Sequence, residues 1–396
     1  MNQENNIISP ATALDELVQR APSEPIVHTA AHKLRVLHGM ESMLGTMLRD
    51  LEQTQRRALF ETYIYRDDRL GRALADALAR TAARGVDTRV LYDPLGSQET
   101  DPAFFDEMRA RGINVRAYRP KETLLAGANP FPRDHTRVIV IDDHGYTGGA
   151  AWGDEWLPIQ LGGHGWHDVC MQVDGPAVQS FVHLFEQRWR EATGEIGVPR
   201  DLEAIYPDLE FVADAPEGAD LVYDRYVQAI ENARGRVWLA NAYFFPPTSM
   251  LKALYDAAVR GVDVQVILTG DSDLEIVGNA ARAEYATWLE RGLKIFEYKG
   301  TIFHAKYAVV DDDLCTIGTM NANPTSMRLA NELNIFVRDP AFVRRVALVF
   351  QADRARSVPV TPETVAARPL IQQVVDRIAN DTLNLVDVLV GPPSRT

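Results

Sequence analysis

The sequence has very little cysteine, no long apolar run and a deficit of positive charge. Its two cysteines, Cys170 and Cys315, are too few for a disulfide framework. We expect both to fill strand interiors in a reducing compartment. No uninterrupted apolar stretch reaches the roughly 18 residues that a membrane-spanning helix needs, and the first residues lack the basic start and apolar core of a signal peptide. These absences predict a cytoplasmic protein whose contact with a membrane is at most peripheral, at the inner face.

The charge balance limits the class of partner. Lys and Arg number 41 against 55 Asp and Glu, which gives a net charge of -14. Because non-specific affinity for nucleic acid depends on neutralising phosphates with Lys and Arg, this balance argues against a nucleic-acid partner. Apolar residues make up 46% of the chain and charged residues 24%, as in ordinary globular proteins. At 396 residues the chain is long enough for two domains with full cores.

The second half of the chain repeats the first at a nearly constant offset. GRALADALARTAARGVDTRVLY, residues 71–92, matches MLKALYDAAVRGVDVQVIL, residues 250–268, and each gives an amphipathic helix, a Gly stop and a Val-rich strand. Strands that alternate with helices predict an α/β fold in which each half is a mixed sheet flanked by helices. We therefore predict two tandem, pseudo-symmetric domains with the active site at their interface. The expected segments are a leader at 1–35, domains at 36–200 and 215–360, and a helical tail at 361–396.

Each half also carries a motif that begins with His. HTRVIVIDDHGYTGG starts at residue 135, and HAKYAVVDDDLCTIGTMN starts at residue 304. Alternation along a strand places His304 and Lys306 on one face, and a turn at Gly318 brings Asn321 back toward the His. A His, a cation and an amide donor that converge form a site for an anionic oxygen. A second His opposite supplies the nucleophile and the acid that covalent phosphoryl transfer requires.

This motif resembles the signature of the phospholipase D superfamily, H-x-K-x4-D-x6-G-(S/T)-x-N. The matching residues are His304, Lys306, Asp311, Gly318, Thr319 and Asn321. The segments ETYIYRDDRLGRALADAL, GGAAWGDEW and NANPTSMRLANELN resemble the bacterial cardiolipin synthases, including members without membrane-spanning segments. The resemblance implies a mechanism without metal or cofactor, in which a phosphatidyl group is held as a phosphohistidine and passed to an alcohol or to water.

The resemblance also implies a role for individual residues. His135 and His304 are the expected catalytic residues, with His135 as the nucleophile and His304 as the general acid. Asp168 is expected to orient His135, and Glu332 to orient His304. The expected phosphate contacts are Arg137, Lys306, Asn321 and Ser326, where Ser326 has helix capping as its alternative role. The residues expected to shape the motif loops are Asp142, Asp311, Gly149 and Gly318.

The first motif departs from the pattern at two places. Arg137 stands where the second motif has Lys, which keeps the charge and allows a bidentate grip on phosphate. The expected Asn is missing: its place falls on Trp152 without a gap, or on Ala151 with a one-residue deletion in the turn. Losing one oxyanion donor costs on the order of 10² to 10³ in rate. Because the His and a candidate orienting acid remain, we expect a working or slowed enzyme.

Further residues allow two interpretations each. Tyr63, Tyr243 and Phe245 either border the site or fill the core. The three Trp residues of one loop region either form a lip for acyl chains or pack the domain interface; they are Trp152, Trp156 and Trp166. His164 and His167 suggest a metal, but no further ligands at a recognisable spacing accompany them, so we expect none. The tail at 370–390 is amphipathic with an acidic polar face, which favours docking on the body over binding to an anionic bilayer.

These observations favour a cardiolipin synthase-like phosphatidyltransferase or phospholipase D that acts on phospholipids. A nuclease of the same superfamily is the second hypothesis, and the charge of -14 counts against it. The third hypothesis is a catalytically impaired scaffold that binds lipid, motivated by the missing Asn. We expect the chain to act as a monomer.

Overall fold

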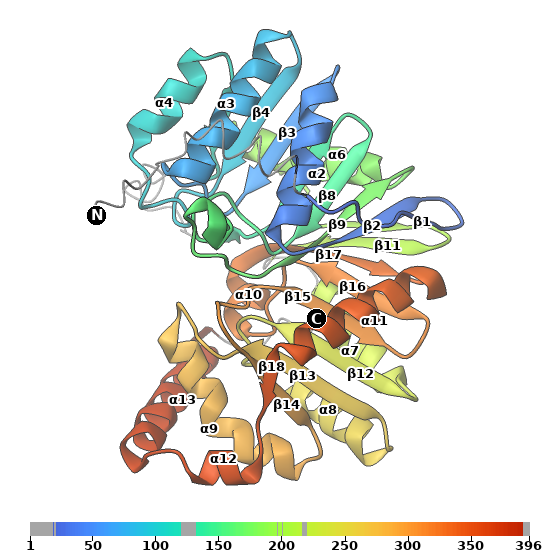
Figure 1. Ribbon diagram of the computed structural model, residues 1–396, viewed down its shortest axis with the longest axis vertical. Coiled ribbons are helices and arrows are strands. Elements are labelled where there is room, and N and C mark those ends of the chain that lie inside the picture. The colour runs from blue at the N-terminus through green and yellow to red at the C-terminus, as the bar shows by residue number, and fades with distance from the viewer. Residues whose placement is uncertain are drawn as a thin grey trace, which may run out of the picture.

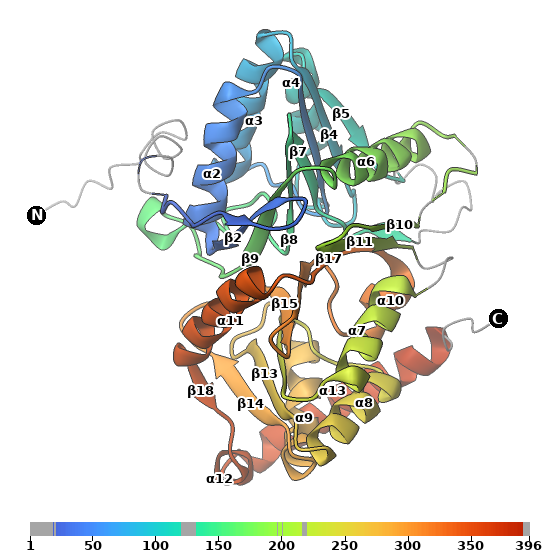
Figure 2. The ribbon, with the colours of Figure 1, turned by 90° about the vertical axis from the view of Figure 1, so that its right-hand side faces the viewer.

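A computed structural model describes residue 19 and residues 21–119, 132–195, 197–199, 201–215 and 220–390. Most of the expected leader lies outside these residues. Figures 1 and 2 show two α/β units stacked along the long axis, with the first half of the chain above the second. Within the described ranges, none of the helices combines the length and the apolar composition that crossing a bilayer requires.

The first half forms a mixed sheet with strand order β1-β2-β9-β8-β7-β3-β4-β5. The neighbours β3, β4 and β5 pair in parallel, while the other pairs are antiparallel. The strands are β1 Val27–His28, β2 Lys33–His38, β3 Arg57–Thr62, β4 Asp87–Tyr92, β5 Asn114–Ala117, β7 Val138–Ile141, β8 His144–Gly148 and β9 Val169–Asp174. The helices are α2 Met40–Gln53, α3 Arg69–Ala83, α4 Pro102–Ala110 and α6 Val178–Ala192, with a short 3-10 turn, η1, at Ile159–Leu161.

The second half forms a sheet with the order β10-β11-β17-β16-β15-β12-β13-β14-β18, and β6 Arg133–Asp134 of the first half joins it beside β17. Its strands are β10 Leu202–Ile205, β11 Leu209–Asp214, β12 Arg236–Asn241, β13 Asp263–Thr269, β14 Lys294–Tyr298, β15 Lys306–Val310, β16 Leu314–Gly318, β17 Ala330–Val337 and β18 Ser357–Pro359. Its helices are α7 Leu221–Asn232, α8 Thr248–Val259, α9 Glu275–Glu290, α10 Pro324–Leu329, α11 Pro340–Ala355, α12 Pro362–Ala366 and α13 Leu370–Val390.

The two sheets share one topology. The order β2-β9-β8-β7-β3-β4-β5 in the first half corresponds, strand for strand, to β11-β17-β16-β15-β12-β13-β14 in the second. Gly85 and Gly261, which follow α3 and α8, have φ of 86° and 87°, a backbone conformation that favours glycine and ends each helix. The predicted α/β fold with two pseudo-symmetric units is confirmed.

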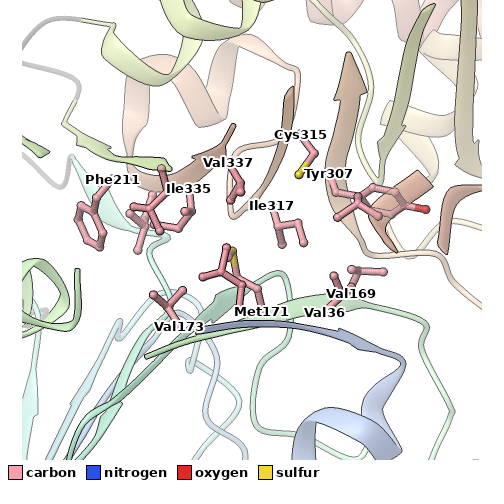
Figure 3. Packing of buried hydrophobic residues seen from close by; sticks show 14 of the residues in the cluster. Val36, Val169, Met171, Val173, Phe211, Tyr307, Cys315, Ile317, Ile335 and Val337 are labelled. Carbon is pink, nitrogen blue, oxygen red and sulfur yellow. The ribbon is translucent and has the colours of Figure 1, made fainter. Parts of the chain in front are cut away.

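The two halves are joined by a shared apolar core. Figure 3 shows Met171 and Val173 of β9 facing Ile317 of β16 and Ile335 of β17 across the interface between the sheets. All four are completely buried. Both cysteines are buried and unpaired, Cys170 in β9 and Cys315 in β16, as the sequence predicts for small residues in strand interiors. Because residues of both halves are buried together in this seam, the shared core fixes how the two halves lie relative to each other.

Candidate active site

Each motif His lies at the seam and is held there by the backbone of the other half. The backbone N–H of His135 donates to the carbonyl oxygen of Asn331 at 3.2 Å. The backbone N–H of His304 donates to the carbonyl oxygen of His167 at 2.8 Å. Asn331 and His167 directly precede the two candidate acids in the chain. The pseudo-twofold therefore places each His beside the acid of the opposite half.

The imidazoles pair with those opposite acids. The Nδ1 atom of His135 lies 2.9 Å from Oε1 of Glu332, and the Nδ1 atom of His304 lies 2.9 Å from Oδ2 of Asp168. The expectation that each acid orients the His of its own half is wrong. The cause is the strand arrangement: Asp168 enters β9 and Glu332 lies in β17, both strands flank the seam, and both side chains reach across it.

The electrostatics of the two pairs differ. Burial raises the pKa of Glu332 to about 8, against the hydrogen bond from Thr319 and the charge of Arg137. Burial opposes ionisation of Asp168 as well, but the hydrogen bond from His304 and the charge of Lys306 outweigh it and lower the pKa of Asp168. At neutral pH the resting site therefore holds an ionised Asp168 and a largely protonated Glu332.

Both imidazoles are uncharged in the resting site. Burial, followed by the charges of Arg137 and Lys306, lowers the pKa of His135 well below its usual range. Burial and Lys306 lower the pKa of His304 to about 4, although Asp168 acts in the opposite direction. Burial also lowers the pKa of Lys306 to about 7. Such a site gains stability when an anion enters and offsets its positive charges.

Two cations lie beside the imidazoles without a carboxylate partner. The Nζ atom of Lys306 is 2.9 Å and 3.0 Å from the two ring nitrogens of His304. The Nη1 atom of Arg137 donates to the carbonyl oxygen of His135 at 2.6 Å, and its Nε has no hydrogen-bond partner in the described residues. Both side chains are buried. Buried cations that form no ion pair within the described ranges indicate an anionic ligand.

Asn321 and Ser326 complete the second half of the site. Nδ2 of Asn321 donates to Oγ of Ser326 at 3.3 Å, and Oδ1 of Asn321 is buried without a partner in the described residues. The side chain of Asn323 caps α10 by accepting from the backbone N–H of Ser326 at 2.9 Å. The capping alternative for Ser326 is therefore wrong, and its hydroxyl group lines the cavity.

The hairpin registers show which residue stands in place of Asn321 in the first motif. Ile141 pairs with His144 across the first turn, whereas Val310 pairs with Leu314 across the second, so the first turn is one residue shorter. With this deletion the counterpart of Asn321 is Ala151, which is completely buried. The first half therefore supplies no amide at this point.

The same alignment matches Gly148 with Gly318 and Gly149 with Thr319. A Cβ atom on Gly149 would lie 2.5 Å from Oδ1 of Asp168, and one on Gly318 would lie 2.3 Å from the carbonyl oxygen of Leu333. Both contacts are shorter than real Cβ atoms show. Glycine at these positions lets the motif turn approach the strand that carries the acid.

The motif aspartates lie away from the imidazoles and hold loops. Asp142 accepts from the backbone N–H groups of residues 55, 56 and 57 at 2.8 to 3.1 Å. Asp311 accepts from those of residues 234, 235 and 236, with bonds of 2.7 to 2.9 Å. Each carboxylate thereby ties its hairpin turn to the loop that precedes β3 or β12.

The site includes a cavity of about 460 Å³. Both imidazoles, Arg137, Asn321 and Ser326 line it. The aromatic and apolar lining residues include Tyr63, Tyr243, Phe245, Trp166, Leu274, Val277 and Leu383. The ring of Tyr63 lies 5.1 Å from that of His135, and the ring of Tyr243 lies 5.7 Å from that of His304. The cavity thus joins a polar centre to apolar walls, which suits an amphiphilic substrate.

The Trp residues do not form an exposed lip. Trp152 and Trp156 are completely buried in the first half, and Trp166 lies 5.7 Å from the ring of His304 within the cavity wall. The Nε1–H of Trp156 donates to Oδ2 of Asp168 at 3.2 Å. Sequence reasoning missed this contact, since a buried Trp carries no sequence signal for holding a carboxylate. It also missed Asp273, whose carboxylate accepts from the hydroxyl group of Tyr243 at 2.8 Å.

His167 belongs to a different group from the one that the sequence suggested. His164 is exposed, while His167 and His38 place their Nε2 atoms 2.9 Å and 2.8 Å from Oδ1 of Asp353. This trio is compatible with a metal by ligand type. Tetrahedral zinc ligands about 2.0 Å from the ion lie about 3.3 Å apart. At 2.8 Å, Nε2 of His38 is hydrogen-bonded to Asp353, whereas Nε2 of His167 lies at ion-pair distance without hydrogen-bond geometry. Tyr307 donates to the other oxygen at 2.6 Å, and together these contacts brace the seam.

Comparison with known proteins agrees with this geometry. Residues 226–354 match the family model described as "Cardiolipin synthase, PLD-like domain". A cardiolipin synthase of Geobacillus sp. (strain WCH70) is 30% identical, over 92% of this chain and 74% of that protein. The major cardiolipin synthase of Bacillus subtilis (strain 168) is 29% identical, over 90% of this chain and 77% of its own.

A solved structure supports the fold over nearly the whole chain. The phosphatidylserine synthase of Haemophilus influenzae Rd KW20 superposes with a TM-score of 0.71, covering 95% of this chain and 99% of that one, at 15% identity. At this identity the likeness concerns the fold alone. Together with the sequence relatives and the paired His motifs, it shows that the chain belongs to the cardiolipin synthase family of phospholipase D-like enzymes.

Proposed function

We propose that the chain transfers phosphatidyl groups between alcohols by cleaving a phospholipid phosphodiester through a phosphohistidine. The main support is the arrangement of two imidazoles from different halves that line one cavity, each hydrogen-bonded at Nδ1 to a buried acid. Arg137 and Lys306, buried beside them, are suited to hold the phosphate oxygens, with Asn321 and Ser326 as further donors. Nothing in this set requires a cofactor to balance the reaction.

The reaction proceeds in two displacements. In the first, Nε2 of His135 attacks phosphorus, a P–N bond forms, the P–O bond to the headgroup alcohol breaks, and His304 donates the proton that the leaving oxygen takes. In the second, an acceptor alcohol gives its proton to His304, its oxygen attacks phosphorus, and the P–N bond breaks. When water replaces the alcohol, the product is phosphatidic acid.

The surroundings of His135 support its assignment as the nucleophile. Its side chain is 13% exposed, and its Nε2 has no hydrogen-bond partner in the described residues, whereas the side chain of His304 is only 4% exposed and contacts Lys306. A nucleophile needs a free Nε2, with the proton on Nδ1 donated to the acid behind it. His304 is uncharged in the resting site and faces an ionised carboxylate. A bound phosphate offsets the charge of Lys306 and raises the pKa of His304, so that the imidazole takes up from solvent the proton that a general acid requires.

A phospholipid substrate also implies where the protein acts. Both halves of the site come from one chain, so a monomer suffices for catalysis. We include in the proposal a peripheral contact with the inner face of the membrane from the cytoplasm, since the substrate resides in the bilayer.

Mass spectrometry of lipid products tests the proposal. Pure protein is incubated with mixed phospholipids and glycerol, alongside His135→Ala and His304→Ala. Headgroup exchange by the wild type and its loss in both variants support the transferase. Phosphatidic acid alone indicates a hydrolase. Cleavage of DNA or RNA without lipid turnover indicates the nuclease, and silence of all three proteins on both substrates indicates a scaffold.

A further inference from the structure

The last helix lies on the body of the protein with its polar side inward. α13 packs along α9 in the second half, as Figure 1 shows at the lower left. Asp376, which is buried, forms an ion pair with Arg368 at 2.7 Å. Nδ2 of Asn380, also buried, donates to Oε1 of Glu284 on α9 at 3.1 Å. The bond to Glu284 ties this helix to α9, and Ala379 packs with Phe245 and Ala280 on the same inward side.

The opposite side of α13 is apolar and faces solvent. Six large apolar side chains on it are between 41% and 80% exposed; they are Leu370, Ile371, Val374, Val375, Ile378 and Leu385. Their spacing of three and four residues places them on one stripe of the helix. The sequence correctly predicted docking on the body, but the orientation is the reverse of that of an ordinary surface helix. A contiguous apolar stripe of this kind marks an interaction site.

The stripe lies on the same helix as part of the active-site wall. Leu383 of α13 lines the cavity, together with Leu274 and Val277 at the start of α9. Leu274 and its neighbour Ile276 are themselves 46% and 44% exposed. Leu383 is partly buried and packs on Phe245, Ala280 and Ala379, so the inward side of α13 contributes to the cavity wall while the stripe on its other side faces solvent.

The charges near the stripe indicate what covers it. Asp381 and Thr382 are the exposed polar residues among the apolar ones, and Arg377 lies beside the stripe. The chain as a whole carries a charge of -14. Electrostatic attraction to anionic headgroups requires clusters of Lys and Arg, which this surface lacks. An occupant that fits is the zone of acyl chains beneath the headgroups, reached by burial of apolar area.

We propose that the exposed stripe of α13 inserts into the surface of a phospholipid bilayer and so presents the cavity mouth to the lipid. The identity of the substrate in this proposal rests on the proposed function. The contact with the bilayer rests on the exposed stripe. It predicts binding to zwitterionic vesicles that is insensitive to salt. A second copy of the chain is the competing occupant.

Vesicle flotation tests this contact. The test variant carries Ile371→Glu, Val374→Glu and Ile378→Glu. The control carries Ile205→Glu, Val259→Glu and Leu348→Glu, three exposed apolar residues on β10, α8 and α11. Wild type and control are expected to float with phosphatidylcholine vesicles in low and high salt, and the test variant to lose about tenfold or more of its binding, because three charges oppose insertion. Equal flotation of all three proteins overturns the proposal.

A second measurement does not depend on how the triple variant folds. Val374→Cys and, as a control, Val259→Cys are labelled with an environment-sensitive dye, since both native cysteines are buried. On addition of phosphatidylcholine vesicles, a blue shift is expected at residue 374 and none at residue 259. No shift at 374 contradicts the proposal. A shift without lipid that grows with protein concentration, with a dimer by light scattering, assigns the stripe to a second copy.

Neither measurement needs turnover, so the two proposals can fail separately. An inactive protein that floats leaves the bilayer contact intact and removes the proposed function. If headgroup exchange occurs, the test variant should lose activity on vesicles while keeping it on short-chain lipids dispersed as monomers. Loss on both substrates contradicts a role confined to membrane contact.

Discussion

Asp168 and Glu332 occupy equivalent places in the two halves but carry different charge. Asp168 accepts hydrogen bonds from His304, from the indole N–H of Trp156 and from the backbone N–H of Val169. Glu332 pairs with His135 and accepts from the hydroxyl group of Thr319. At Asp168 the hydrogen bond from His304 and the neighbouring charges outweigh burial, so its pKa is lowered. At Glu332 burial outweighs the hydrogen bonds from Thr319 and Ser326 and the neighbouring positive charges, so its pKa is raised. The pseudo-symmetric frame thus gives its two imidazoles partners of different charge.

We predict that Asp168→Asn slows headgroup exchange more than Glu332→Gln does. Asn cannot stabilise the imidazolium of His304, and at a catalytic His such a change costs about 10³ to 10⁴ in kcat. Gln preserves the neutral partner of His135 that the raised pKa of Glu332 already provides. The values of kcat for both variants check this. Equal losses would show that both acids act as carboxylates.

The same asymmetry predicts how stability depends on pH. Burial raises the pKa of Glu332 from 4.5 to about 8, so between these values the folded state binds the proton that the unfolded state releases. The contribution of this group is therefore fully present below about pH 4.5 and is lost as the pH rises through about 8. Glu332→Gln has no carboxyl group to ionise, so it does not lose this stability. As the pH rises from about 4.5 to about 8, the free energy of unfolding of the variant relative to wild type should therefore increase by about a few kcal/mol. Urea unfolding at several pH values measures it; a constant difference contradicts the ionisation argument.

Residue identities were more predictable than their pairings. The motif pattern identifies His135, His304 and Lys306 because type and spacing carry the chemistry. The crossing of the acids depends on β9 and β17 meeting at the seam, which no local pattern encodes. The contact of Trp156 with Asp168 was missed for the same reason.

At the scale of elements, α11 is tied to the first half by Asp353. Its carboxylate lies within hydrogen-bonding distance of His38, His167 and the hydroxyl group of Tyr307. His167 and His38 lower its pKa despite burial. His167 directly precedes Asp168 in the chain. This contact therefore links the outer helix to the loop that positions Asp168.

We predict that Asp353→Asn destabilises the protein by about 3 to 5 kcal/mol, because the surrounding donors lose a buried charged partner. The matched control is Asp312→Asn in the second hairpin turn, whose side chain is 90% exposed and whose substitution should cost about 1 kcal/mol or less. Thermal or urea unfolding of both variants provides the comparison. If Asp353→Asn and the control lose the same free energy of unfolding, the contacts of Asp353 do not stabilise the seam between the halves.

Elements with strong periodicity were predictable, including the repeated helix, Gly stop and strand in each half. The orientation of α13 was not. Its apolar residues predict an inward face, but Asn380 bonds to Glu284 of α9 and Asp376 pairs with Arg368 just before the helix, so the apolar stripe faces outward. The turn before β8 shows a similar limit: the sequence allowed Trp152 or Ala151 as the counterpart of Asn321, and the strand register decides for Ala151.

At the scale of the whole molecule, the halves depend on each other. Met171 and Ile317 belong to one core that spans the seam, and neither half contains both members of a His–acid pair. The sequence shows the duplication directly. It predicts that the two copies meet at an interface, but it does not show how they are placed. The placement arises from burial of apolar strands that show no preference for a partner in isolation.

We predict that the chain unfolds in a single cooperative transition, since exposing either half also exposes the shared core. Differential scanning calorimetry of the wild type tests this, with agreement between the calorimetric and van't Hoff enthalpies as the criterion. Two resolved transitions would show that the seam contributes little and that each half is stable alone.

The most direct test of the account is to trap the covalent intermediate. Wild type and His135→Ala are mixed with phospholipid, quenched without acid, digested and searched by mass spectrometry for a phosphatidyl adduct. The account predicts an adduct on His135 in the wild type and none in the variant. An adduct on His304 would reverse the two roles, and product formation by His135→Ala without any histidine adduct would contradict the phosphohistidine mechanism.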